Sequence, residues 1–135
     1  LEDKGSIITY TDYEEEVIKK LIKTYPDLSE NLNHIVERLV DLEKIIRENY
    51  YHPDFHGRTS LKIILPVLVP EMTYEGMEIA DGETASVYFA LMALGKYTDE
   101  EADKIKKNLL IYCKQDTLAM VEIYKRLSGI TRTQS

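Results

Sequence analysis

Several common features are scarce or missing in this sequence of 135 residues, and each absence excludes a class of protein. Its one cysteine, Cys113, excludes an internal disulfide framework and predicts a reducing, cytoplasmic compartment. No apolar run approaches the roughly 20 residues that span a bilayer, so we expect no membrane partner. Repeats and Gly/Ser-rich linkers are also missing. We therefore expect residues 1–135 to form a single domain.

Positive charge is also scarce. Lysine and arginine number 17 against 24 acidic residues, which gives a formal net charge of −7. This balance argues against broad electrostatic binding to nucleic acid, which leaves a basic surface. It does not exclude an enzyme that reaches phosphates through bound divalent cations, because acidic ligands hold such cations and the cations reverse the local charge.

The first half of the chain contains one strong strand signal. Ser6–Tyr10 (SIITY) is β-branched and aromatic, and it predicts a strand. Thr11 and Glu14 have the spacing of a capping box, which predicts a helix that Pro26 ends. A second helix is expected from Ser29 through Leu42, followed by a loop over 50–60.

The second half is predicted to be helical. A short helix follows Thr59 or Ser60, with Pro66 and Pro70 marking its end, and another covers 83–94. Thr98 and Glu101 form a further capping box for a long last helix that ends near Ser128–Gly129. A lone strand needs pairing partners. Because the chain begins LEDKGSIITY without a methionine, we expect it to be the C-terminal part of a larger domain.

One polar residue interrupts the apolar face of the last helix. The face recurs at steps of three and four residues and comprises Ile105, Leu109, Tyr112, Asp116, Met120, Ile123 and Leu127. Burying a carboxylate costs several kcal/mol unless it is paired or binds a metal. Two interpretations follow: Asp116 accepts a hydrogen bond from a tyrosine, or it is a metal ligand.

The segment YCKQD fits Tyr-x-x-x-Asp, the third motif of the tyrosine branch of DEDD 3′→5′ exonucleases. Together with HPDFHGRTSLK and YCKQDTLAMV, it resembles a bacterial and archaeal domain-of-unknown-function family over about residues 7–127. That family is often found in RecB-type nuclease proteins and has a predicted ribonuclease-H-like core. The resemblance implies an α/β, ribonuclease-H-like fold, truncated at the N-terminus so that the visible chain is mostly helical with one or two strands.

The resemblance also implies site residues. YTDYE occupies the place of the second motif, with Tyr10 in the asparagine position, Tyr13 as the aromatic and Glu14 as the acid. The tyrosine at position 10 departs from the motif and puts the contact of that asparagine in doubt. The first motif, Asp-x-Glu, has no counterpart in this chain and would precede Ser6–Tyr10.

The implied chemistry is two-metal hydrolysis. Two Mg²⁺ or Mn²⁺ ions roughly 4 Å apart activate a water and stabilise the leaving oxygen of a phosphodiester. By resemblance, Asp116 and Glu14 are metal ligands, and Tyr112 orients the attacking water. With two of four acidic ligands missing, we expect this chain alone to have little activity, and we expect Asp116 to be partly enclosed near Glu14.

The loop over 50–60 has two interpretations. Tyr50, Tyr51 and Phe55, with Tyr13, are candidates for stacking on bases, and Arg58 and Lys62 for contacting phosphates. Alternatively, the loop's aromatic residues pack on one another. A zinc site at His52 and His56 is disfavoured, because Pro53 breaks the helix and Cys113 is the only cysteine.

Two functions therefore stay open. The first is a metal-dependent nuclease domain, a 3′→5′ exonuclease that acts on DNA rather than RNA, with RecB-type nuclease or helicase domains as partners in the parent protein. The second is a non-catalytic helical interaction module derived from such a nuclease. The departure at Tyr10 and the acidic charge favour the second.

Overall fold

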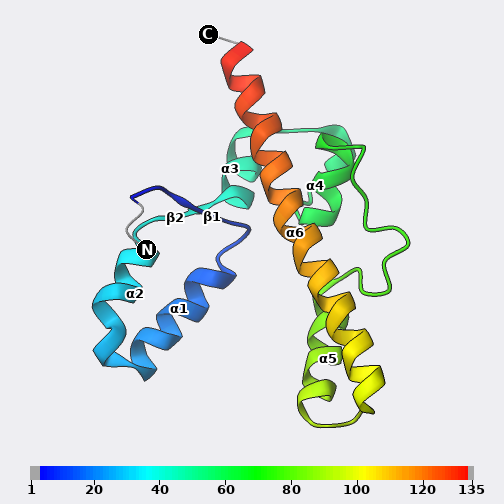
Figure 1. Cartoon of the computed structure of the whole chain (residues 1–135). Helices are drawn as coiled ribbons and strands as arrows, with labels where there is room; N and C mark the ends of the chain where they lie inside the picture. Colours follow the sequence, from blue (N-terminus) through cyan, green and yellow to red (C-terminus); the bar gives the residue numbers. More distant parts are fainter. Residues whose placement is uncertain (1–3, 134–135) are drawn as a thin grey trace. The chain divides into compact units, whose positions relative to one another are not determined.

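The computed structural model describes residues 4–133, and the side chains of residues 4–130. Most of the chain is helical, and its two strands form one parallel sheet (Figure 1). The chain divides into two compact units, Leu1–Val67 and Leu68–Ser135. The expected single domain over residues 1–135 stays a prediction.

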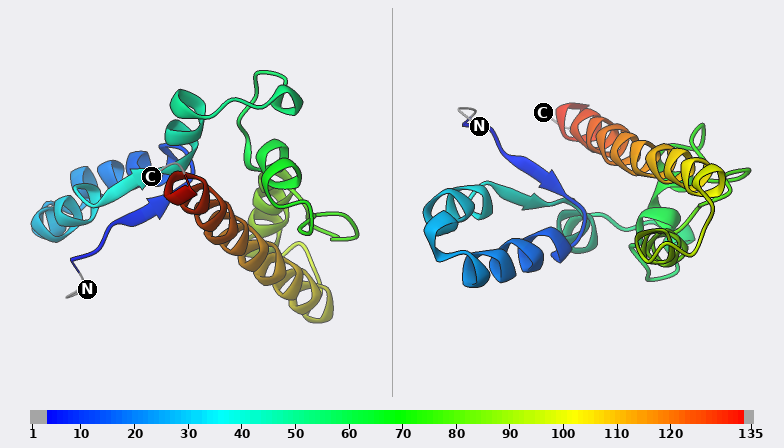
Figure 2. Two further views of the ribbon diagram at one scale, coloured as in Figure 1. Left: turned by 90° about the horizontal axis from the view of Figure 1, so that it is seen from above. Right: turned by 60° about the horizontal axis from the view of Figure 1, so that its bottom comes forward.

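The first unit begins with strand β1 (Ile7–Thr9) and helix α1 (Tyr13–Thr24). A short 3₁₀ helix η1 (Pro26–Leu28) leads into α2 (Ser29–Val36), which packs beside α1 (Figure 2). Strand β2 (Leu39–Asp41) then runs parallel to β1, with Ile8 opposite Val40. Parallel strands need such a crossover, and here α1 and α2 supply it.

Strand β2 corrects two expectations. The helix expected from Ser29 through Leu42 is wrong, because the chain leaves α2 after Val36 and pairs with β1. The expectation of a lone strand is wrong for the same reason. Pairing begins where Ile7 N–H donates to the carbonyl of Arg38 at 2.8 Å, and Arg38 Nε donates to the carbonyl of Gly5 at 2.7 Å. These long-range bonds override the local helical spacing.

The rest of the first unit agrees in part with the elements expected from the sequence, which did not include the next helix. Helix α3 (Leu42–Asn49) is capped by Asp41, whose Oδ1 accepts from Lys44 N–H at 3.2 Å. The expected loop follows and contains a 3₁₀ turn, η2 (Pro53–Phe55). Helix α4 (Leu61–Leu68) starts after Ser60, whose carbonyl accepts from the backbone of α4. It continues through Pro66, so this proline does not end it.

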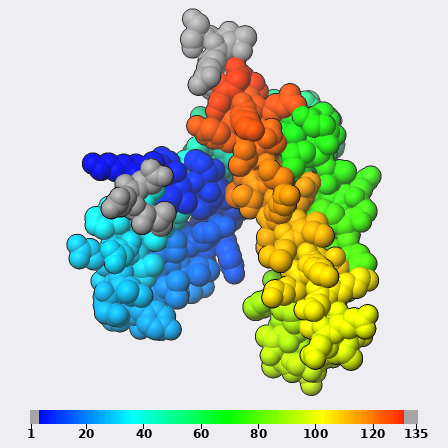
Figure 3. Space-filling view, in the orientation of Figure 1, coloured from blue at the N-terminus to red at the C-terminus, as the bar shows by residue number. Residues whose placement is uncertain are grey.

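The second unit has a turn-rich segment and two helices, α5 (Gly82–Ala93) and α6 (Asp99–Thr133). The space-filling view shows α5 packed against the first part of α6 (Figure 3). The Thr98–Glu101 capping box is confirmed, since each residue's backbone N–H donates to the other's side chain. Helix α6 does not end near Ser128–Gly129 but continues to Thr133.

The coarse fold class is confirmed as α and β elements with a small parallel sheet. Fully buried side chains occur in both units and include Ile46, Leu65, Val69 and Ile123. No helix in the described part of the chain is long and apolar enough to cross a membrane.

Candidate functional site

The inward face of α6 carries Asp116, as the sequence spacing predicts. Ile105 and Ile123 at either end of this face are buried, and Asp116 between them is half-buried. The expected partial enclosure of Asp116 is therefore confirmed. Its position requires partners for the carboxylate, because an unpaired buried charge is costly.

The first partner of Asp116 is a residue that the sequence analysis missed. Tyr74, in the segment between α4 and α5, donates its hydroxyl hydrogen to Asp116 Oδ1 across 2.6 Å. One residue earlier in this segment, the carbonyl of Thr73 accepts a hydrogen bond from Gln115 Nε2 at 3.0 Å. Two adjacent residues of α6 thus hold the segment in place. The only sequence signal was a tyrosine in a turn, which is too common to single out.

The second partner is Tyr112, one helical turn before Asp116. Its ring lies against that of Tyr74, with the centroids 6.3 Å apart and the planes at 46°. Its hydroxyl lies at the first turn of α5, 3.6 Å from the position that a Cβ atom on Gly82 would occupy. The Asp116 carboxylate thus lies between two tyrosines from different segments of the same unit.

The environment of Tyr112 keeps its hydroxyl protonated. Partial burial raises the pKa of this phenol well above its usual value, and a hydrogen bond to Asp116 raises it further. The negative charges of Asp116 and Asp81 act in the same direction. At neutral pH Tyr112 is therefore a hydrogen-bond donor, able to orient a carboxylate or a water but not to act as a phenolate base.

Glu14 lies exposed in the first turn of α1 in the other unit. The Thr11–Glu14 capping box is wrong, because Asp12 occupies the N-cap position and Thr11 has a φ of 71°. The backbone N–H of Thr11 instead donates to Asp41 Oδ1 at 3.0 Å. The competing explanation of Glu14 as a capping residue is thereby removed. Its expected proximity to Asp116 stays a prediction, since the two residues belong to separate units.

Tyr10, which departs from the family motif, has a structural contact. Its hydroxyl donates to the carbonyl of Thr59 at 2.6 Å and so joins the end of β1 to the loop before α4. The Thr59 hydroxyl in turn donates to Glu43. Burial raises the pKa of Tyr10 well above its usual value, and the charges of Glu43 and Asp41 add to the effect.

The loop over 50–60 divides its candidate residues into two groups. Phe55 is 3% exposed and contacts the rings of Tyr50 and His52, so its ring offers no face to a base. This matches the interpretation of a loop packed by its own aromatics.

The remaining substrate candidates are accessible to a ligand. They are Tyr13, Tyr51, Arg58 and Lys62, with Tyr51 82% exposed and Tyr13 68% exposed. Their role in substrate binding stays a prediction.

The described residues offer few ligands for a divalent cation. Asp116 offers hard carboxylate oxygens, which suit Mg²⁺ and Mn²⁺. Within residues 4–130, no three side chains among His, Cys, Asp and Glu are grouped so that they could hold a metal ion. The chemistry of Asp116 fits a metal ligand. Its described neighbours are the hydroxyls of Tyr74 and Tyr112, and the charge of Asp81 also acts on Tyr112.

Comparison with known proteins gives one match. Residues 1–60 match the model of a family described as a domain of unknown function, DUF2779. No curated protein and no solved structure matches the chain. The expected resemblance to a domain-of-unknown-function family is confirmed in this coarser form. The matched residues run from β1 to the loop before α4, so they include Glu14 but not Tyr112 or Asp116.

Proposed function

We propose that the chain is part of a metal-dependent nuclease domain that hydrolyses nucleic-acid phosphodiesters from the 3′ end. The observation that carries this proposal is the half-buried Asp116 on the inward face of α6, with the Tyr112 hydroxyl one turn away. The spacing is that of the Tyr-x-x-x-Asp motif. The α/β unit, in which strand β1 leads into a helix with Glu14 exposed in its first turn, agrees with the second motif.

The roles of the residues follow from their chemistry. Asp116 and Glu14 would hold Mg²⁺ or Mn²⁺, which supplies activation of water and stabilisation of the leaving oxygen. Tyr112, kept protonated by burial and by Asp116, donates a hydrogen bond and orients what lies beside the carboxylate. Tyr74 fixes the carboxylate through Oδ1. Carboxylates held by such hydrogen bonds keep their orientation, which metal sites need.

A second function, the non-catalytic helical module, is favoured by a specific observation. The hydrogen bond from Tyr74 at 2.6 Å partly satisfies Asp116 without a metal. The net charge of −7 also agrees with a surface that does not attract nucleic acid by itself. The two functions differ in whether Asp116 is needed for chemistry or only for folding.

The deciding experiment uses the longest natural protein that contains this chain, with any RecB-type nuclease domain inactivated. End-labelled single-stranded DNA is incubated with Mn²⁺ and the wild-type protein, Asp116→Asn or Asp103→Asn. Asp103 is an exposed acid on the same helix and serves as the matched control. The nuclease proposal expects stepwise shortening by wild type and Asp103→Asn, and a loss of at least about a hundredfold in Asp116→Asn.

Circular dichroism and thermal unfolding establish that Asp116→Asn is folded. Equal shortening by all three proteins, or shortening by none, would contradict the nuclease proposal. Either result would favour the second function, the non-catalytic helical module.

A further inference from the structure

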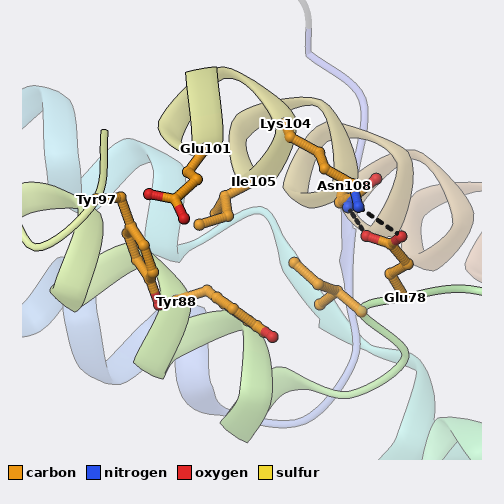
Figure 4. Close-up of a pocket in the computed structure, with 8 residues that line it drawn as sticks. Glu78, Tyr88, Tyr97, Glu101, Lys104, Ile105 and Asn108 are labelled. Atoms are coloured by element: carbon orange, nitrogen blue, oxygen red, sulfur yellow. Dashed lines mark hydrogen bonds and ion pairs between the residues drawn. The ribbon is translucent and has the colours of Figure 1, made fainter. Parts of the chain in front are cut away.

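A cavity in the second unit does not have Asp116 in its lining. It has a volume of about 200 Å³ and lies between α5, α6 and the segment before α5 (Figure 4). Its apolar surface comes from Ile79 and Ile105, which are 2% and 9% exposed. Tyr88 and Tyr97 line one side, with ring centroids 6.4 Å apart and planes inclined by 32°. The cavity therefore combines a small apolar surface with two aromatic rings.

The charged residues at this cavity leave a surplus of negative charge. Lys104 Nζ lies 3.0 Å from Glu78 Oε1, and Asn108 also donates to Glu78, so this lysine and this glutamate balance each other. Glu101 accepts hydrogen bonds only from the uncharged backbone N–H and hydroxyl of Thr98, among the contacts described for residues 4–130. These bonds lower the pKa of Glu101, so its carboxylate is ionised at neutral pH. No lysine or arginine forms an ion pair with Glu101 in the part of the chain whose side chains the structure describes, so the lining has two carboxylates and one ammonium group.

An adjoining hollow has the same kinds of residue in its lining, aromatic and acidic. It has a volume of about 440 Å³, shares Tyr88 and Tyr97 with the first cavity, and adds Glu83 to its lining. Both hollows thus share the two tyrosines, and each has its own acidic residue in the lining, Glu101 in the first and Glu83 in the second. A phosphate would be repelled by these carboxylates, so the cavity does not extend a nucleic-acid site.

We propose that this cavity binds an organic cation, an ammonium or guanidinium group carried on an apolar stem. The faces of Tyr88 and Tyr97 attract a cation through their ring quadrupoles. The Glu101 carboxylate accepts its N–H donors in a charge-assisted bond. Ile79 and Ile105 cover the stem, as apolar surfaces commonly do for lysine and arginine side chains. This inference does not depend on the proposed nuclease function.

A cationic group of this kind occurs in two sorts of ligand, a free amine and a basic side chain of a partner protein. Agmatine represents the first source, and the peptide Gly-Gly-Arg-Gly-Gly the second. Nα-acetyl-citrulline amide matches Nα-acetyl-arginine amide in shape but has no charge, so the pair isolates the charge. Binding of each probe to the full chain of 135 residues is followed by NMR.

The expected affinity for the arginine probe is about millimolar, since one cation and a short stem make few contacts. Resonances of Tyr88, Tyr97 and Ile105 should shift on titration. Citrulline should bind at least about fivefold more weakly, which corresponds to one exposed charge interaction of about 1 kcal/mol. Tighter binding of agmatine would identify a free amine as the ligand, and tighter binding of the peptide a partner side chain.

Three variants test the named residues. Glu101→Gln keeps the capping box, because glutamine also serves at this position, but it removes the charge and should weaken binding about fivefold. Glu100→Gln changes an exposed neighbour that does not line the cavity and should leave binding unchanged. The Tyr97→Phe variant should bind the arginine probe and the Tyr97→Leu variant should not, since only phenylalanine keeps the aromatic face. Equal binding of arginine and citrulline probes, or equal effects of Glu101→Gln and Glu100→Gln, would overturn the proposal.

Discussion

Asp116 and its two tyrosines are the residue-scale basis of this account. Asp116 and Tyr112 could be predicted from sequence, because helical periodicity alone places them on one inward face. Tyr74 could not, since it reaches Asp116 from 42 residues away in a segment without regular structure. Such a contact depends on how the turn before α5 lies on α6. Phe55 shows the converse: its residue type suggested base stacking, and its burial shows that it packs within the loop.

The raised pKa of Tyr112 gives the first prediction. Below about pH 10, tyrosine is protonated in the unfolded chain as well as in the folded protein. In this range the contacts of Tyr112 make their full contribution to the free energy of unfolding. That contribution is lost as the pH rises from this value through the higher folded pKa. The measurement is a pH titration followed by absorbance at 295 nm, and the difference between wild type and Tyr112→Phe isolates the signal of Tyr112. We expect this signal to appear at a higher pH than that of an ordinary tyrosine. Asp116→Asn should lower this pKa. An unchanged pKa in Asp116→Asn would contradict the assigned coupling.

The hydrogen bond from Tyr74 gives the second prediction. Removing the hydroxyl in Tyr74→Phe takes away a donor to a half-buried carboxylate, and we expect a loss of about 1–2 kcal/mol in the free energy of unfolding. Urea denaturation measures it. Tyr124→Phe, on an exposed tyrosine of α6, is the control and should change little. Equal stability of both variants would mean that the bond does not stabilise the fold.

At the scale of elements, two similar sequence patterns have different outcomes. Thr98 and Glu101 form the expected capping box, because the chain enters α6 directly from a turn. Thr11 and Glu14 do not, because the end of β1 and the carboxylate of Asp41 hold Thr11 with a φ of 71°. Strand β2 was missed for a related reason: Leu39 in the strand and Leu42 just after it continue the apolar helical spacing of α2, and only pairing with β1 reveals the strand.

The capping box of α6 gives a third prediction. Thr98→Ala removes the hydroxyl that accepts from Glu101 N–H, so we expect about 1 kcal/mol of destabilisation. Thr98→Ser keeps the hydroxyl and should retain most of the stability. Thermal unfolding followed by circular dichroism compares the three proteins. If Thr98→Ala and Thr98→Ser destabilise the protein equally, the hydroxyl at the cap does not contribute to stability.

The conformation of Thr11 gives a fourth prediction. A β-branched residue with positive φ is strained, and glycine adopts this conformation without a steric penalty. Because the Asp41 contact uses the backbone N–H, Thr11→Gly preserves it. We expect an increase of up to about 1 kcal/mol in the free energy of unfolding, measured with urea. A clear loss of stability would show that the threonine side chain has a role beyond its backbone conformation.

At the scale of the whole molecule, the sequence predicted the class of fold better than its details. A mostly helical chain with few strands is what the structure shows, and the parallel crossover β1–α1–α2–β2 is an α/β feature. The ribonuclease-H-like core stays part of the proposal, because two short strands do not define it. The family match ends at residue 60, within the first of the two units. Function therefore rests on whether Asp116, which lies outside the matched residues, is a metal ligand.

The most direct test is Mn²⁺ binding by the longest natural protein that contains this chain, measured by electron paramagnetic resonance of free Mn²⁺. Wild type, Asp116→Asn and the control Asp103→Asn are compared, with Glu14→Gln as the second candidate ligand. We expect both Asp116→Asn and Glu14→Gln to lower the Mn²⁺ affinity at least about tenfold, and Asp103→Asn to leave it unchanged. Unchanged Mn²⁺ affinity in a folded Asp116→Asn protein would contradict the claim that this carboxylate is a metal ligand.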